Sequence, residues 1–158
     1  MRLSVRLLAC LGACVTLLLV GAPTASAALA QVELLSFDRQ TGGYGVQVTG
    51  AVTCDPPELP NTMTYLSVTL YQGKYPHRNY IQGFGGIVDP TQPPIVCDGT
   101  AHEHSFTVVR TADYADRMFR AGLATAIYVV TQCTEVAPGD FHCTPTADET
   151  RERVKITP

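Results

Sequence analysis

Residues 44–54, YGVQVTGAVTC, alternate between apolar and polar or small positions throughout their length. A period of two is typical of a β-strand with one buried face. The apolar face carries Tyr44, Val46, Val48, Val52 and Cys54. Gly50 falls on the same face, where a side chain is expected, and therefore predicts a bend or a close contact between strands.

Other segments show the same kind of pattern. Residues 64–72, TYLSVTLYQ, place Leu66, Val68 and Leu70 on one face. Residues 123–133, LATAIYVVTQC, are apolar on both faces, which predicts a central strand covered on both sides. Shorter strands are expected at residues 30–37, 104–110, 141–145 and 151–158.

The middle of the chain is rich in turn-forming residues. Residues 72–94 hold four glycines and four prolines, and residues 80–84 are the only candidate there for a short edge strand. Residues 111–122 predict a helical turn from which Met118 and Phe119 reach inward. Short strands, little helix and no repeat predict an antiparallel immunoglobulin-like β-sandwich of about seven strands.

The first residues have the features of an export signal. Arg2 and Arg6 precede an apolar run from residue 7 to residue 20, and small residues follow at 25–27. We expect a signal peptide at residues 1–27, with cleavage as late as residue 30, and one secreted domain at residues 28–158. The alternative is a lipid anchor on Cys14, within LGAC. No later segment is apolar enough to span a membrane.

Four cysteines follow the leader, and an even number in an exported chain predicts two disulfides. Three pairings are possible. We favour Cys133 with Cys143, because the turn residues Pro138-Gly139-Asp140 lie between them. Cys54 then pairs with Cys97. The main competitor joins Cys54 to Cys133 and Cys97 to Cys143.

The charge of the chain argues against some partners. After the leader, nine Lys and Arg residues face fourteen Asp and Glu residues. An acidic protein has little attraction for phosphate backbones or anionic membranes, so nucleic acid is excluded as a partner. We expect a monomer that needs no cofactor.

Residues 71–86, YQGKYPHRNYIQGFGG, are the best candidate for a binding surface. Tyrosines mixed with Gly, Asn and basic residues are typical of binding loops, since tyrosine gives contact area at a low entropy cost. The predicted binding residues are Tyr71, Tyr75, His77, Arg78, Tyr80 and Phe84. The partner is a protein, a surface polymer or a small molecule. The structural alternative is a tyrosine-rich edge that caps the core.

Residues 96–106, VCDGTAHEHSF, gather groups that could hold a metal. His102 and His104 are two residues apart, so on a strand they point to the same face. Phe106 and Val108 share that face, which favours histidines that continue the inward side of the strand. No HExxH, CxxC or GxSxG motif is present, so we expect neither a metal site nor a catalytic residue. A metal-dependent hydrolase is the minor alternative.

Three segments carry a resemblance to a known family. GVQVTGAVTC, CDGTAHEHSFTV and FRAGLATA resemble the landmarks of small secreted actinobacterial domains of unknown function. The resemblance implies an immunoglobulin-like sandwich and no established activity. In that family a large aromatic residue is common at the position of His104, where this chain departs. A weaker likeness, to enediyne antibiotic apoproteins, rests on architecture and the ten-residue Cys133–Cys143 loop, and implies a small-molecule carrier.

Overall fold

A computed structural model describes residues 30–75, 77–87, 94–146 and 148–158. The predicted signal peptide and Cys14 lie outside the described residues. The elements are β1 (Gln31–Arg39), β2 (Gly45–Thr53), β3 (Thr62–Gln72), β4 (Ile81–Ile87), β5 (Ala101–Arg110), the short 3-10 helix η1 (Ala112–Tyr114), β6 (Gly122–Ala137), β7 (Asp140–Pro145) and β8 (Thr150–Ile156). No helix within these ranges is long and apolar enough to cross a membrane.

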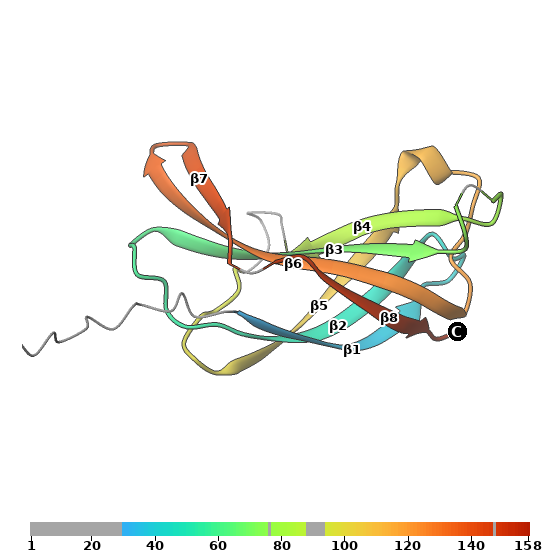
Figure 1. Ribbon diagram of the computed structural model, residues 1–158, viewed down its shortest axis with the longest axis horizontal. Coiled ribbons are helices and arrows are strands. Elements are labelled where there is room, and N and C mark those ends of the chain that lie inside the picture. The colour runs from blue at the N-terminus through green and yellow to red at the C-terminus, as the bar shows by residue number, and fades with distance from the viewer. Residues whose placement is uncertain (1–29, 76, 88–93, 147) are drawn as a thin grey trace, which may run out of the picture.

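The eight strands form one antiparallel sheet that curls until it nearly closes (Figure 1). Its order is β1-β2-β5-β4-β3-β6-β7, and β8 pairs with the first half of β6. The two ends of the sheet meet where the amide of Arg39 donates to the carbonyl of Thr157, at 3.1 Å. The predicted all-β antiparallel fold is therefore confirmed, in the form of a sheet that is close to a barrel.

Strand β4 connects the two halves of this sheet. It pairs with β3 along its whole length and with β5 at residues 83–85. The prediction of an edge strand at residues 80–84 is therefore wrong. Residues 81–87 carry no periodic signal, because glycines replace the side chains that would show one. Gly86 has a φ of +141°, and a Cβ at this position would collide with the carbonyl oxygen of Leu66.

The core lies inside the curled sheet and follows the predicted alternation, except at Tyr44, which was predicted on the buried face but is 50% exposed. Val46, Val48 and Val52 of β2 are fully buried. The predicted close contact at Gly50 is confirmed, because a Cβ there would lie 3.1 Å from both the side chain of Leu34 and the carbonyl oxygen of Glu33. The other buried strand residues include Leu66, Val68, Leu70, Ile81, Phe106, Val108, Ala126, Val154 and Ile156.

Two predictions about burial need correction. Strand β6 was expected to be covered on both sides, but Leu123 is 63% exposed and Ile127 and Val129 are only half-buried. The strand is central in the hydrogen-bonding order, yet it belongs to a single layer whose outer face is at the surface. In the β5–β6 connection, Phe119 is fully buried as predicted, whereas Met118 is half-exposed.

Both favoured disulfides are confirmed. Cys54 follows β2 and pairs with Cys97, which precedes β5, the ladder neighbour of β2. Cys133 of β6 pairs with Cys143, directly opposite on β7. Two such bonds are typical of proteins that fold in an oxidising, extracellular compartment.

The crowding at Gly86 can be tested by substitution. Gly86→Ala should destabilise the protein by at least about 2 kcal/mol, because it adds a steric collision to an unfavourable backbone conformation. Gly122→Ala is the matched control, since Gly122 has a similar φ of +134° but nothing within 4 Å of its Cβ position. Chemical denaturation should show a clearly smaller loss for Gly122→Ala. Equal losses of stability in the two variants would mean that steric crowding around Gly86 does not contribute to the effect.

Candidate functional site

The pairing of β3, β4, β5 and β6 brings two long connections together at one end of the molecule (Figure 1). These are residues 73–80, between β3 and β4, and residues 110–121, from the last residue of β5 to the start of β6. Together with the adjoining ends of the strands, we call them the loop end. The side chain of Gln72 fastens them together. Its amide nitrogen donates to the carbonyl of Arg120 at 2.7 Å, and its amide oxygen accepts from the Arg120 backbone N–H at 2.8 Å.

A buried phenylalanine anchors the second connection to the core. The backbone N–H of Phe119 donates to the carbonyl of Gly43 at 2.9 Å. Its ring lies against Gly83 of β4, where a Cβ would come within 2.7 Å of the ring. The residues on either side of Phe119 are consequently held at fixed positions on the loop end.

Four tyrosines form a cluster on the loop end. The ring of Tyr80 is central, with ring centroids 5.4 Å from Tyr75, 5.5 Å from Tyr114 and 6.2 Å from Tyr71. Tyr75 and Tyr114 meet Tyr80 edge-on, a favourable arrangement between aromatic rings, and Tyr71 lies tilted against it. Burial raises the pKa of Tyr80, and the neighbouring phenol groups raise it further, so its hydroxyl stays neutral near pH 7.

Arginine side chains tie this cluster to the β5–β6 connection. The Arg117 guanidinium lies 5.1 Å from the centre of the Tyr114 ring and donates to the carbonyl of Tyr80. The guanidinium of Arg110 donates to the carbonyl of Arg117 at 2.6 Å and lies 4.5 Å from the ring centre of Tyr44. Cation–π contacts of this kind stabilise the loop arrangement. These two arginines are thus occupied in holding the loops.

Beside the tyrosine cluster, His77, Arg78, Asn79 and Arg120 line an open depression of about 510 Å³. We call it the basic depression. All four residues are exposed. Among the described residues, no carboxylate lies within ion-pair distance of Arg78 or Arg120. The two guanidinium groups are therefore available to a ligand from solvent.

The charge of the loop end is opposite to that of the rest of the domain. Residues 73–80 and 110–121 contain five Lys and Arg residues but only Asp113 and Asp116 as acids. The remaining residues from 30 onward contain four Lys and Arg residues and twelve Asp and Glu residues. A local positive potential on an acidic body attracts and orients anions.

The structure brings five of the six predicted binding residues to the loop end. Tyr71, Tyr75 and Tyr80 belong to the tyrosine cluster, and His77 and Arg78 line the basic depression. The sixth, Phe84, lies apart from them: it is 48% exposed on the outer face of β4, opposite Val109 of β5.

Sequence reasoning missed Tyr114, Arg117 and Arg120, which complete the loop end. They lie more than thirty residues further along the chain, in the segment predicted only as a helical turn. The available signal was the position of Arg120, which lies two residues before β6, the strand that pairs with β3.

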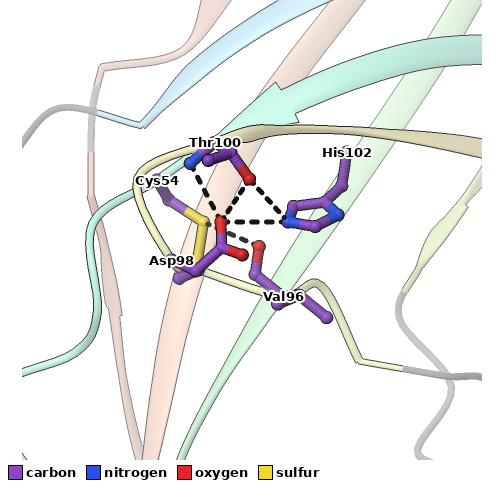
Figure 2. Close-up of polar contacts among 6 residues, drawn as sticks. Cys54, Val96, Asp98, Thr100 and His102 are labelled. Atoms are coloured by element: carbon purple, nitrogen blue, oxygen red, sulfur yellow. Dashed lines mark hydrogen bonds and ion pairs between the residues drawn. A yellow bond between two sulfur atoms is a disulfide. The ribbon is translucent and has the colours of Figure 1, made fainter.

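The cluster in residues 96–106 is a stabilised turn (Figure 2). One carboxylate oxygen, Oδ1 of Asp98, accepts from the Thr100 backbone N–H at 2.9 Å and from its hydroxyl at 2.6 Å. His102 Nε2 lies 3.0 Å from the same oxygen. A hydrogen bond from the backbone N–H of a residue to the aspartate side chain two positions earlier is typical of an Asx turn. The predicted turn at Asp98-Gly99 is confirmed, and the Gly99 N–H also donates to the carbonyl of Cys54.

This turn differs in geometry from a catalytic relay. In a relay, histidine contacts the nucleophile with one nitrogen and the acid with the other. Here the single nitrogen Nε2 of His102 faces both Asp98 and Thr100, at 3.0 and 3.1 Å. The hydrogen bonds from Thr100, followed by the contact with His102, lower the pKa of Asp98 to about 2. The carboxylate is thereby kept ionised as the acceptor of the turn.

His104 faces inward on β5, opposite Gly50 of β2. Its Nε2 is buried and has no hydrogen-bond partner among the residues described. Burial lowers the pKa of His104, and the neighbouring His102 lowers it further. The two histidines do share a face, as predicted, together with the buried Phe106 and Val108. Across the described ranges, no three His, Cys, Asp or Glu residues gather where they could hold a metal ion.

A second pocket lies where the two ends of the sheet diverge. It has a volume of about 260 Å³ and lies between the start of β1 and the middle of β6, next to the start of β8. We call it the seam pocket. Its lining residues are Ala30, Gln31, Val32, Tyr128, Val129, Val130, Asp148 and Thr150.

Comparison with protein-family models, curated proteins and solved structures gives no match to this chain. The candidate sites are therefore judged on their geometry and chemistry alone.

The unpaired nitrogen of His104 predicts a stabilising substitution. His104→Phe should raise the free energy of unfolding by about 1 kcal/mol at pH 7, because it removes a buried polar group without a partner. The gain should grow as the pH falls below 6.5, the ordinary pKa of histidine. In that range the unfolded chain takes up a proton that folded His104 binds less readily, so the unsubstituted protein loses stability.

Urea denaturation between pH 5 and pH 8 would measure this effect. His142→Phe is the control, since His142 is exposed on β7 and its replacement removes no buried polar group, so it should not raise the free energy of unfolding. A His104→Phe protein that is less stable at every pH would contradict the assignment of an unsatisfied nitrogen.

Proposed function

We propose that this protein is a secreted, non-enzymatic binding domain that engages its ligand through the loop end. The observation that carries the proposal is the basic depression beside the tyrosine cluster. Tyrosine and arginine are the residues most enriched where binding energy concentrates, because each combines a large contact area with polar groups. Buried Phe119 and the hydrogen bonds of Gln72 and Arg117 hold the backbone of these loops, so little backbone ordering is needed when a ligand binds.

The export signal and the fold class belong to the same proposal. A leader at residues 1–27 would deliver the chain to the compartment in which its two disulfides form. We further propose that the nearly closed sheet is an immunoglobulin-like sandwich whose halves are joined by β4. The pairing of β2 with β5 and of β3 with β6, and the contact between β1 and β8, support this classification. The same strands are the basis on which we propose that the chain belongs to the family of small secreted actinobacterial domains.

A small-molecule carrier is the second candidate, and the seam pocket supports it. Val32 and Val130 give the pocket apolar walls, and Tyr128 contributes an aromatic ring. Its volume of about 260 Å³ lies just below the range typical of small-molecule sites, roughly 300 to 1,000 Å³. The basic depression, at about 510 Å³, falls inside that range, and its lining includes two arginines that can bind a charged ligand. The loop end is therefore the better candidate.

Binding through the loop end can be tested with the triple variant Tyr75→Ala, His77→Ala and Arg78→Ala. All three side chains are exposed, so the melting temperature should change by no more than about 3 °C. The immobilised native protein should retain a component of the culture in which it is naturally made, from the supernatant or the envelope fraction. The triple variant should lose that component. Equal retention by both proteins, or loss only with a fall in melting temperature, would argue against the proposal.

A further inference from the structure

We propose that the basic depression binds an acidic polysaccharide, with Arg78 and Arg120 holding an oxyanion of the polymer and Tyr75 supporting an adjacent sugar ring. The inference rests on the proposed binding function of the loop end and names its ligand class. It is carried by the residues that line the depression, by the exposure of Tyr75 and by the charge of the loop end.

The two arginines come from different connections and meet at one depression. Arg120 is fixed at the backbone by the reciprocal hydrogen bonds with Gln72, at 2.7 and 2.8 Å. The loop that carries Arg78 is folded by two turns, in which the N–H of His77 donates to Lys74 and the N–H of Tyr80 donates to His77. Guanidinium groups recognise planar carboxylates and tetrahedral phosphate or sulfate groups through paired hydrogen bonds. The depression is therefore suited to an oxyanion.

The other side chains nearby are suited to a sugar. Tyr75 is 71% exposed although its ring also packs edge-on against Tyr80, so one large aromatic surface on the loop that carries Arg78 faces solvent. Such a ring can cover the apolar C–H face of a pyranose, and its amphipathic character suits it to a wet site. Asn79 lines the depression and offers both a donor and an acceptor for hydroxyl groups.

The shape of the site favours a carbohydrate over an acidic protein. The depression is concave, with a volume of about 510 Å³, a size typical of sites for small molecules or for one part of a polymer. It is open at the surface, so a chain could continue on either side. A protein partner would instead require a buried area of about 800 Å² on each side. The positive charge of the loop end would also speed the approach of a polyanion.

The test uses four defined polymers and the complete mature domain. Polygalacturonate presents carboxylates on a sugar chain, dextran sulfate presents sulfates, dextran is neutral, and polyglutamate presents carboxylates on a peptide backbone. Calorimetry or affinity electrophoresis should detect binding of one or both anionic polysaccharides, and their comparison distinguishes the carboxylate from the sulfate. Dextran and polyglutamate should bind at least about tenfold more weakly, because each lacks one of the two recognised features.

A matched pair of double variants separates a site from a general charge effect. Arg78→Ala with Arg120→Ala should weaken polysaccharide binding about tenfold or more. Arg151→Ala with Arg153→Ala removes the same charge from two exposed arginines of β8, and should leave affinity within about twofold. Tyr75→Ala should weaken binding of the polysaccharides while leaving the melting temperature unchanged.

The results that would overturn the polysaccharide as ligand differ from those that would overturn the proposed binding function. Equal losses in the two double variants would show unspecific attraction between charges. Tight binding of polyglutamate alone would identify an acidic protein as the ligand class. If no polymer binds, while the native protein still retains a culture component that the triple loop variant does not, the polysaccharide is wrong and the binding function remains. If that retention is also absent, both are wrong.

Discussion

The constraint on which this structure depends is the pairing of β4 with strands on both of its edges. One edge carries the ladder to β3 and the other carries the ladder to β5, so a single strand links the two halves of the sheet. The backbone of β4 can lie this close to its neighbours only because glycine has no side chain at the contact, most clearly at Gly86. The arrangement also fixes which connections become neighbours. The loops that precede β4 and follow β5 must emerge at the same end.

In the loop end, the residues that hold the connections are less exposed than the residues that face solvent. Phe119, Gln72 and the guanidinium groups of Arg110 and Arg117 hold the connections in place. Arg78, Arg120 and Tyr75 then project from a fixed frame with their functional groups in solvent. Because the holding residues differ from the presenting residues, a ligand site can be removed without unfolding the domain. The backbone of such a site needs little further ordering on binding.

The sequence revealed those features that local patterns encode. Alternation predicted the buried faces of β2 and β3, and the turn residues between Cys133 and Cys143 predicted that disulfide. It could not reveal the role of β4, since Gly83, Gly85 and Gly86 erase the alternation that marks a strand. The contribution of Arg120 was hidden for another reason. Its neighbours in space are far away in the chain, and only the pairing of β3 with β6 brings them together.

The central claim is that residues from both connections form one site for an anionic sugar polymer. The most direct measurement is the change in backbone amide chemical shifts when a fragment of the anionic polysaccharide that binds, either trigalacturonic acid or a short dextran sulfate, is added to isotope-labelled protein. The account predicts shifts at His77, Arg78 and Asn79 together with Arg120, and none at Arg151 or Arg153 of β8. Shifts confined to one connection, to the seam pocket or spread evenly over the charged surface would contradict it.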